Sequence, residues 1–268
     1  MKNGIDLSQK AGLSIGFDRD LERLFFTDSL VSVQPDIRTW YQMISVLSKC
    51  PHNTPKEFYQ MYRGLGNLTD LSLLDNLGLR FDVTVIPPRM IGTRGEISMG
   101  GKMPQEYIKT LGHSHAMPEV YEVLHGEAIY LMQDSIGSHS FAIHAKPGEK
   151  VIIPSFEGHV TINPGDDYLI MANFISSRTV SEYESFKEMG GAMHFFLNSG
   201  EKNRWIANPN YAGYDLRDPV GLNAMMPLDF YKSLGFSREE PMYTSSKRKN
   251  FQNLNFLKKP LKRDSVDI

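Results

Sequence analysis

Short hydrophobic runs separated by turn residues dominate the chain between residues 107 and 174. The runs cover 107–113, 119–125, 127–133, 139–145, 150–154, 158–163 and 168–174, and an earlier one covers 81–86. Gly126 and Gly148 stand at two of the boundaries, as turn residues do between strands. Many short strands in quick succession are typical of a β-sandwich or barrel. This part of the chain is therefore predicted to be mainly β.

The first 75 residues follow a different pattern. Apolar residues recur at helical spacing across 18–50, and a short amphipathic helix is predicted at 54–62. The aromatic residues of that second stretch, Phe58, Tyr59 and Tyr62, are expected on its packing face. We predict an N-terminal helical segment, residues 1–75, packed on a β-barrel at 76–200.

Beyond residue 180 the pattern weakens. A helix is predicted at 181–188, a strand at 192–197 and a C-terminal extension over 201–268. From Lys247 to Arg263 there are seven Lys or Arg residues and no acidic one. A basic run of this kind is usually solvated, so we expect a solvated basic tail.

Composition narrows the class of protein. With 268 residues, 41% of them hydrophobic, the chain can bury a sizeable core. A formal charge of −2 gives no general attraction to nucleic acid or membranes. A small polar ligand is therefore expected, and binding to nucleic acid or membranes is not. The single cysteine, Cys50, excludes an intrachain disulfide and favours a reducing compartment. Without an apolar leader or a run of about 18 apolar residues, the protein is expected in the cytoplasm.

Three histidines and a glutamate have the spacing of a metal site. Successive side chains of a strand alternate between faces, so His113 and His115 would point the same way. Glu119 follows shortly afterwards, and His159 comes five residues after Pro154. Three imidazoles and a carboxylate suit a divalent first-row metal such as Fe, Ni, Mn or Zn. Such a set leaves coordination positions open, as catalytic sites do.

Two glutamates of the 119–125 run compete for the ligand position. Odd and even positions of one strand face opposite sides, so Glu119 shares a face with Tyr121 while Glu122 lies on the other. The spacing to Gly126 also favours Glu119. His125, His139 and His144 are expected at the surface or in hydrogen bonds.

The whole set resembles the two-part signature of the cupin superfamily. The residues in register are His113, His115, Glu119, Gly126, Gly148, Pro154, His159 and Asn163. One departure is Phe156, where the signature usually has glycine. The resemblance implies a double-stranded β-helix, or jelly-roll barrel, here with N-terminal helices and a C-terminal extension.

A narrower resemblance covers about residues 80–175. Thr110-Leu111-Gly112-His113-Ser114-His115 followed by Glu119-Val120-Tyr121 is similar to the cupin-type glucose-6-phosphate isomerases of archaea and some bacteria. It implies His113, His115, Glu119 and His159 as metal ligands, Glu119 also as the proton-transferring base, and Tyr121 as a catalytic residue of the cavity wall. Thr84 and Thr110 match phosphate-binding positions, and backbone N–H groups near Gly112 would add donors.

Two family positions differ in this chain. The family has a tyrosine near the place of Phe174 and, a few residues later, a histidine where this chain has Val180 and then Tyr183.

The implied reaction is the interconversion of glucose 6-phosphate and fructose 6-phosphate. One divalent ion, Fe²⁺ first and Ni²⁺, Mn²⁺ or Zn²⁺ as alternatives, would polarise the C1 and C2 oxygens while a proton or a hydride moves between the carbons. A homodimer is expected from exposed sheet edges. The rival interpretations are an Fe(II)-dependent cupin dioxygenase and a non-catalytic sugar-binding protein.

Overall fold

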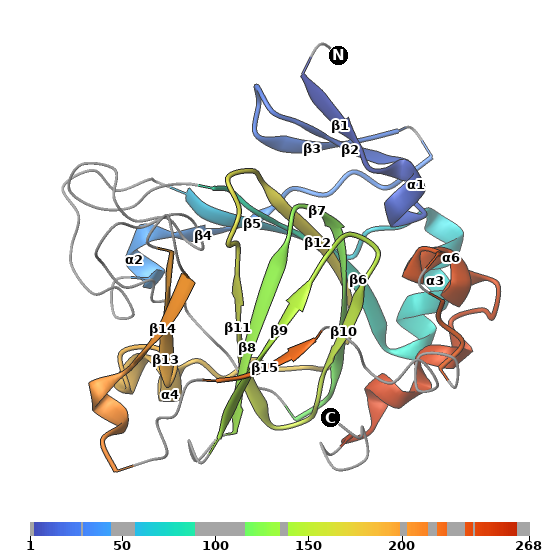
Figure 1. The fold of residues 1–268 in the computed structure, drawn as a ribbon. Helices are drawn as coiled ribbons and strands as arrows, with labels where there is room; N and C mark the ends of the chain where they lie inside the picture. Colours follow the sequence, from blue (N-terminus) through green and yellow to red (C-terminus); the bar gives the residue numbers. More distant parts are fainter. Residues whose placement is uncertain are drawn as a thin grey trace.

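The computed structural model describes residues 3–27, 29–43, 57–88, 116–134, 139–198, 203–213, 219–223, 234–237 and 239–261 (Figure 1). Two larger sheets form its centre. The six-stranded sheet has the order β10 (Lys150–Ile153), β7 (Glu119–His125), β12 (Leu169–Ser176), β6 (Leu79–Ile86), β5 (Glu57–Arg63), β4 (Asp36–Thr39). The four-stranded sheet has the order β11 (Glu157–Ile162), β8 (Ala128–Asp134), β9 (Ser140–Ala145), β15 (Val220–Asn223).

The chain passes back and forth between these sheets. It leaves the six-stranded sheet after β7, forms the antiparallel pair β8 and β9 in the other, returns for β10, crosses again for β11 and returns for β12. This alternation is the path of a jelly roll. The predicted mainly β barrel is confirmed, and the 119–125 run coincides with β7. The run at 107–113 lies outside the described residues.

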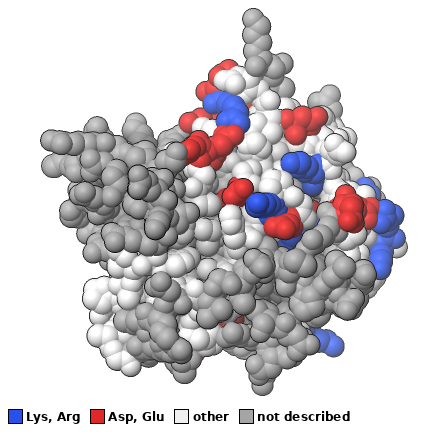
Figure 2. All heavy atoms as spheres, in the orientation of Figure 1, with Lys and Arg blue, Asp and Glu red and all other residues white. Residues whose placement is uncertain are grey.

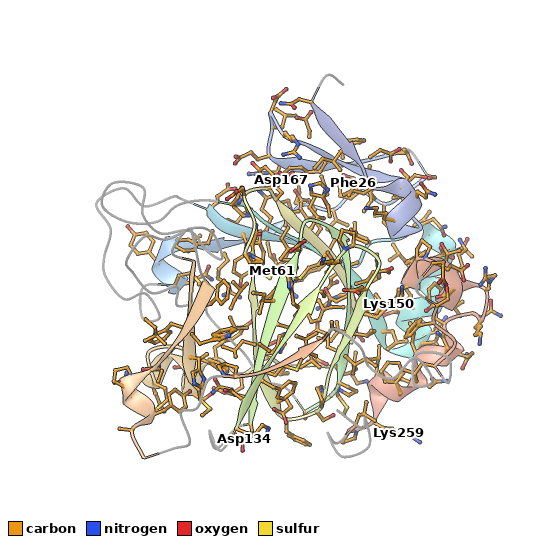
Figure 3. All side chains as sticks on the ribbon, viewed as in Figure 1. Phe26, Met61, Asp134, Lys150, Asp167 and Lys259 are labelled. Carbon is orange, nitrogen blue, oxygen red and sulfur yellow. The ribbon has the colours of Figure 1, made fainter. Side chains whose placement is uncertain are left out.

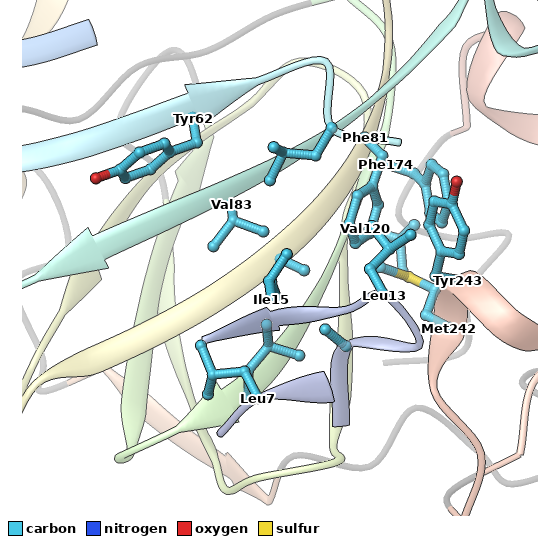
Figure 4. Close-up of a cluster of buried hydrophobic side chains, with 14 of the residues drawn as sticks. Leu7, Leu13, Ile15, Tyr62, Phe81, Val83, Val120, Phe174, Met242 and Tyr243 are labelled. Atoms are coloured by element: carbon cyan, nitrogen blue, oxygen red, sulfur yellow. The ribbon is translucent and has the colours of Figure 1, made fainter. Parts of the chain in front are cut away.

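Each face of the six-stranded sheet packs on its own hydrophobic core. One core lies between the two sheets and contains Tyr121, Tyr130 and Met171. The other covers the outer face of the six-stranded sheet. Figure 4 shows its three contributors, which are the N-terminal residues Leu7, Leu13 and Ile15, the sheet residues Tyr62, Phe81, Val83, Val120 and Phe174, and the C-terminal residues Met242 and Tyr243. Strands buried on both faces read as nearly continuous hydrophobic runs.

The N-terminal region corrects the prediction of helices. It contains β1 (Gly4–Asp6), α1 (Ser8–Ala11), β2 (Ile15–Asp18), β3 (Arg23–Phe26), β4, α2 (Trp40–Met43), β5 and α3 (Leu68–Leu77). The helix predicted at 54–62 is wrong where it is described, because residues 57–63 form β5, and only α2 is helical between 18 and 43. Buried Phe58, Gln60 and Tyr62 alternate along β5. Gln60 is buried because its amide donates to the Glu22 carbonyl and accepts from the Tyr62 hydroxyl.

The C-terminal region is also packed more closely than predicted. After α4 (Glu184–Glu188), which falls within the helix predicted at 181–188, come β13 (His194–Asn198), β14 (Asn203–Ala207), η2 (Pro209–Tyr211), β15, α6 (Met242–Lys247) and η3 (Gln252–Lys258). The prediction of an unpacked arm is wrong for residues 247–261, because Phe251, Leu254 and Leu257 are buried against the sheet. The basic side chains of 247–249 and 258–259 are exposed, as expected. Lys247 Nζ lies 2.7 Å from the buried Asp70 carboxylate. The division of the chain at residues 76 and 201 stays a prediction.

Charged side chains on the face drawn in Figure 2 lie as neighbours of opposite sign, in keeping with the formal charge of −2. Within the described ranges, every helix is too short or too polar to cross a membrane.

The turn between β10 and β11 contains the departure from the cupin signature. Phe156 has a φ of +65°, in the left-handed region where a Cβ atom is unfavourable. Glycine adopts this conformation without that cost, which explains why glycine is usual there. The Phe156 side chain is 55% exposed, so the turn keeps its shape without burying the ring.

Candidate active site

A cavity of about 280 Å³ opens between the two sheets. Its walls come from β5, β6, β7 and β12 of the six-stranded sheet, from β11 of the other, and from residues 179–183. Along β6 the alternate residues Arg80, Asp82, Thr84 and Ile86 line it, as the two-residue period of a strand requires. The volume is near the lower end for small-molecule sites.

A carboxylate, an imidazole and a phenol meet in this cavity. Glu119 begins β7 and is 2% exposed. Its Oε1 accepts a 2.6 Å hydrogen bond from Asn173 Nδ2 on the neighbouring strand β12, and its Oε2 lies 3.9 Å from His159 Nε2 on β11. The Tyr121 hydroxyl lies 3.2 Å from the same imidazole nitrogen. Three strands from two sheets thus place these groups around one point.

The Tyr121 hydroxyl is held in its protonated form. Burial, followed by the negative charge of Glu119, keeps the pKa of Tyr121 well above its usual value. A neutral phenol can donate a hydrogen bond to an oxygen that gains negative charge. Tyr121 can therefore donate to such an oxygen of a molecule in the cavity.

Glu122 lies on the opposite face of β7, as the alternation predicts. Its carboxylate is 2.9 Å from Lys150 Nζ and accepts a 2.7 Å hydrogen bond from the Met242 backbone N–H. Burial raises the pKa of Glu122 to about 7, against the lowering effect of Lys150 and of the Met242 N–H. Glu122 contacts the outer core, and Glu119 faces the cavity.

Four of the predicted site residues lie on this cavity. They are Thr84, Glu119, Tyr121 and His159. The other four, Thr110, Gly112, His113 and His115, lie outside the described residues, and their roles stay predictions.

Two histidines expected at the surface or in hydrogen bonds are indeed hydrogen-bonded. His125 Nε2 lies 3.0 Å from Asp167, and His144 Nε2 lies 2.8 Å from Glu127. The third, His139, is partly buried between Asp134 and Glu157. All three lie outside the lining of the cavity.

The donor atoms present fit a metal ion. Among the described residues, no group of three or more His, Cys, Asp or Glu side chains has the arrangement of a metal site, and two of the four predicted ligands are described. His159 Nε2 and Glu119 Oε2 are 3.9 Å apart. This is less than about 4.2 Å, roughly the sum of two first-row metal bonds to nitrogen and oxygen. Both atoms can therefore bind the same ion.

Three charged residues of the cavity were not predicted as site residues. Arg63, Arg80 and Asp82 line it beside Thr84. The signal was present in the strand at 81–86, because Thr84 shares its face with Asp82 and, two residues earlier, with Arg80. Once Thr84 is placed on the cavity, Asp82 and Arg80 are expected to face the cavity as well.

The two places where this chain departs from the family pattern, Phe174 and the 180–183 stretch, differ in their position relative to the cavity. Phe174 packs in the outer core, away from the cavity, while its neighbours Asn173 and Ile175 face the cavity. Val180 is exposed, and Tyr183 lines the cavity.

A jelly roll of two sheets, antiparallel except for the parallel pair β9 and β15, around a cavity with a buried carboxylate and an imidazole defines a cupin. Residues 45–212 match the family model "Glucose-6-phosphate isomerase (GPI)", and the chain belongs to this family in its cupin form.

Alignments with individual relatives cover a shorter part of the chain than the family model does. The glucose-6-phosphate isomerase of Thermococcus kodakarensis is 30% identical over 114 residues, which are 41% of this chain and 59% of the relative. That of Pyrococcus furiosus has the same identity and coverage. The chain thus spans about three fifths of the length of the curated relatives it matches. Among solved structures, hazelnut vicilin is 12% identical, with a TM-score of 0.38, covering 59% of this chain and 37% of the vicilin.

Proposed function

We propose that the protein is a metal-dependent isomerase that interconverts glucose 6-phosphate and fructose 6-phosphate. The observation that carries this proposal is the buried Glu119 carboxylate, which faces a cavity of about 280 Å³ beside His159 and Tyr121. Membership of the glucose-6-phosphate isomerase family supports the choice of reaction.

Glu119 is proposed as the base. It would remove the proton from C2 of the aldose, as O1 takes up a proton, to give a cis-enediol. It would then return the proton to C1, as O2 gives up its hydroxyl proton, to give the ketose. A positioned acid–base group of this kind typically contributes about 10²- to 10⁴-fold to the rate. The Asn173 amide, which donates to Glu119 Oε1 at 2.6 Å, orients the carboxylate, and the Tyr121 hydroxyl would donate to a sugar oxygen.

A hydride shift between C2 and C1 is the alternative route. The two routes differ for glucose 6-phosphate that carries deuterium at C2. Transfer through Glu119 exchanges part of the label with solvent, whereas a hydride shift carries all of it to C1. We expect exchange, measured by NMR of the product. Complete retention of the label would leave Glu119 without a role as base.

His113, His115, Glu119 and His159 are proposed as the ligands of one divalent ion, Fe²⁺ first and Ni²⁺, Mn²⁺ or Zn²⁺ as alternatives. When bound, the ion would polarise the C1 and C2 oxygens as a Lewis acid. Metal analysis of the purified protein, before and after chelation, is expected to find one equivalent that is lost together with activity. Loss of the metal with full activity would contradict the proposal.

The phosphate group of the sugar phosphate is proposed to bind at Thr84, Thr110 and Gly112. Thr84 lines the cavity on β6, and a phosphate dianion is bound best through several hydrogen-bond donors.

One assay separates the isomerase from its rivals. Conversion of fructose 6-phosphate to glucose 6-phosphate under anaerobic conditions is expected, and it excludes a dioxygenase because no oxygen is consumed. A sugar-binding protein without catalysis would instead be stabilised against heat by the ligand and form no product.

A homodimer is proposed as the assembly. In the described part of the chain, β4 and β15 stand at sheet edges, and free edges favour pairing between chains. Light scattering on the purified protein is expected to give twice the chain mass of 30.4 kDa.

A further inference from the structure

A cluster of two arginines and an aspartate forms part of the cavity wall. Arg63 ends β5, and Arg80 and Asp82 lie on β6. The Asp82 carboxylate is 5% exposed; it accepts hydrogen bonds from Arg80 Nε at 2.8 and 2.9 Å and from the Gly64 N–H at 2.9 Å. Arg63 Nη1 lies 3.7 Å from Asp82 Oδ2. Asp82 thus fixes Arg80 firmly and holds Arg63 close by.

The hydrogen-bonding capacity of Arg80 is only partly used. Arg80 binds Asp82 through Nε, and within the described ranges its two Nη groups make no hydrogen bond. Arg63 is used more fully, because its Nε donates to Asp36 and its Nη2 contacts the Met61 sulfur; Met61, which also lines the cavity, is labelled in Figure 3. The fork of Arg80 is therefore available to a ligand in the cavity.

The balance of charge on this wall favours an anion. Arg38 lies 5.6 and 5.1 Å from the ring centroids of Tyr59 and Tyr183, which line the cavity. In the described part of the chain Arg38 pairs with these two rings and with no carboxylate. The guanidinium groups of Arg38, Arg63 and Arg80 thus outnumber the carboxylates paired with them.

The cluster lies at a suitable distance from the reacting groups. Strand pairing sets Tyr121 opposite Asn173, Asn173 opposite Asp82, and Asp82 opposite Arg63. Neighbouring strands are about 4.8 Å apart, so Tyr121 and Asp82 are separated by roughly 10 Å across the sheet. An open-chain hexose 6-phosphate whose C1 and C2 lie at Tyr121 can reach this wall with its phosphoryl group.

We propose that Arg80 and Arg63, positioned by Asp82, bind the phosphoryl group of the sugar phosphate and make the cavity selective for phosphorylated sugars over neutral ones. The inference rests on the proposed function, to which it adds the charged half of the phosphate subsite. Thr84, two residues beyond Asp82 on the same face of β6, supplies a neutral donor. Arginine suits this role because its planar fork matches phosphate oxygens in pairs.

The main test is Arg80→Met, which keeps much of the side-chain volume and removes the charge. We expect KM for fructose 6-phosphate to rise by about 10- to 100-fold, since a hydrogen bond between charged groups is lost. The change in kcat is expected to stay within about threefold, because the reacting carbons lie at the other end of the substrate. The Ki of inorganic phosphate as a competitive inhibitor is expected to rise with KM. Unchanged KM and Ki would overturn the proposal.

Arg19→Met is the matched control. Arg19 also binds a carboxylate, Asp167, and its side chain is 30% exposed against 29% for Arg80. It lies outside the lining of the cavity. Its replacement is expected to lower stability without changing KM. An equal rise of KM in both variants would assign the effect to the fold and overturn the proposal.

Arg80→Lys keeps the test decisive if Arg80→Met does not fold. Lysine retains a positive charge beside buried Asp82 but lacks the fork. KM is expected to rise by about three- to tenfold. A folded Arg80→Lys protein with the KM of the wild type would overturn the proposal.

Binding of inorganic phosphate, followed by ³¹P NMR line broadening, separates this inference from the proposed function. In one outcome the wild type isomerises no sugar phosphate but binds inorganic phosphate, and the Arg80→Met variant does not bind it. The proposed reaction is then wrong and the proposed phosphate subsite stands. If the wild type isomerises fructose 6-phosphate and Arg80→Met binds phosphate equally well, the reaction stands and the subsite is wrong.

Discussion

Glu119 and Glu122 occupy the same strand three residues apart, are 2% and 3% exposed, and have opposite surroundings. Glu119 faces the cavity, with an amide donor on one oxygen and an imidazole near the other. Glu122 faces the outer core, where Lys150, labelled in Figure 3, and the Met242 N–H hold it. Equal burial therefore does not distinguish a carboxylate that faces a cavity from one that faces a packed core. The partners do.

The difference follows from the period of the strand. Because β7 is buried on both faces, alternate positions send one carboxylate to each core. The Glu122 carboxylate is paired with the buried Lys150 ammonium, whereas the Glu119 carboxylate accepts from a neutral amide. Substitutions on one face of β7 at a time test whether the two faces act independently.

The largest expected effect is on the cavity side. Glu119→Gln removes the proposed base while keeping the shape of the side chain. We expect kcat to fall by about 10²- to 10⁴-fold, measured by anaerobic conversion of fructose 6-phosphate with the metal content determined in the same sample. A variant that retains its metal and the original rate would show that Glu119 is not the base.

On the outer side, Lys150→Met is expected to act on stability alone. Removing one partner of a buried ion pair costs about 3–5 kcal/mol, and here it takes away the ammonium group that holds the buried Glu122 carboxyl. Denaturant unfolding measures this loss, and kcat/KM of the folded fraction is expected to be that of the wild type. The control is the double variant Lys150→Met with Glu122→Met, which removes both charges and is expected to recover much of the stability. A large fall in kcat/KM for the single variant would contradict the separation of the two faces.

Stability is expected to depend on pH through Glu122. Its pKa is about 7 in the folded protein and 4.5 for the ordinary side chain. The folded state therefore binds a proton more tightly, and the contribution of this group to stability is complete below about pH 4.5 and is lost as the pH rises to about 7. Relative to Glu122→Gln, the free energy of unfolding of the wild type is expected to fall by about 3 kcal/mol over this range. Parallel pH profiles for the two proteins would rule out the titration of Glu122.

A smaller effect is expected from Asn173→Ala. This change removes the 2.6 Å hydrogen bond to Glu119 Oε1 and leaves the carboxylate free to turn. We expect kcat to fall by about tenfold, since a hydrogen bond to a charged group is lost. The control is Asn253→Ala, which removes a partly buried amide far along the chain that donates to the Leu234 carbonyl. It is expected to change stability and not kcat, and an equal fall of kcat in both would contradict a specific role for Asn173.

The strands of the barrel could be predicted because each one is recognisable from its own residues. β7 to β12 are short apolar runs bounded by glycine and proline, and Glu119 could be separated from Glu122 by counting positions from Gly126. The cavity residues Thr84, Tyr121 and His159 followed from the resemblance, and the fold brings them to one cavity.

The N-terminal strands were not predictable by the same rule. In β5, Gln60 interrupts the apolar alternation, and the aromatic residues that remain have helical spacing. Only the fold shows that the Gln60 amide is satisfied inside the protein by Glu22 and Tyr62. Arg63 was missed for a related reason, because its approach to Asp82 depends on the pairing of β5 with β6. Arg80 could have been assigned from the sequence, because it shares a face of β6 with Thr84.

The hydrogen bond from the Met242 N–H to Glu122 reaches across 120 positions of the sequence. It joins the start of α6 to the back of the strand whose front carries Glu119. A protease cut or an inserted fusion partner just before Met242 would pull this donor away and disturb β7 from behind. A label in the C-terminal region is therefore expected to disturb the cavity least where α6 is left intact.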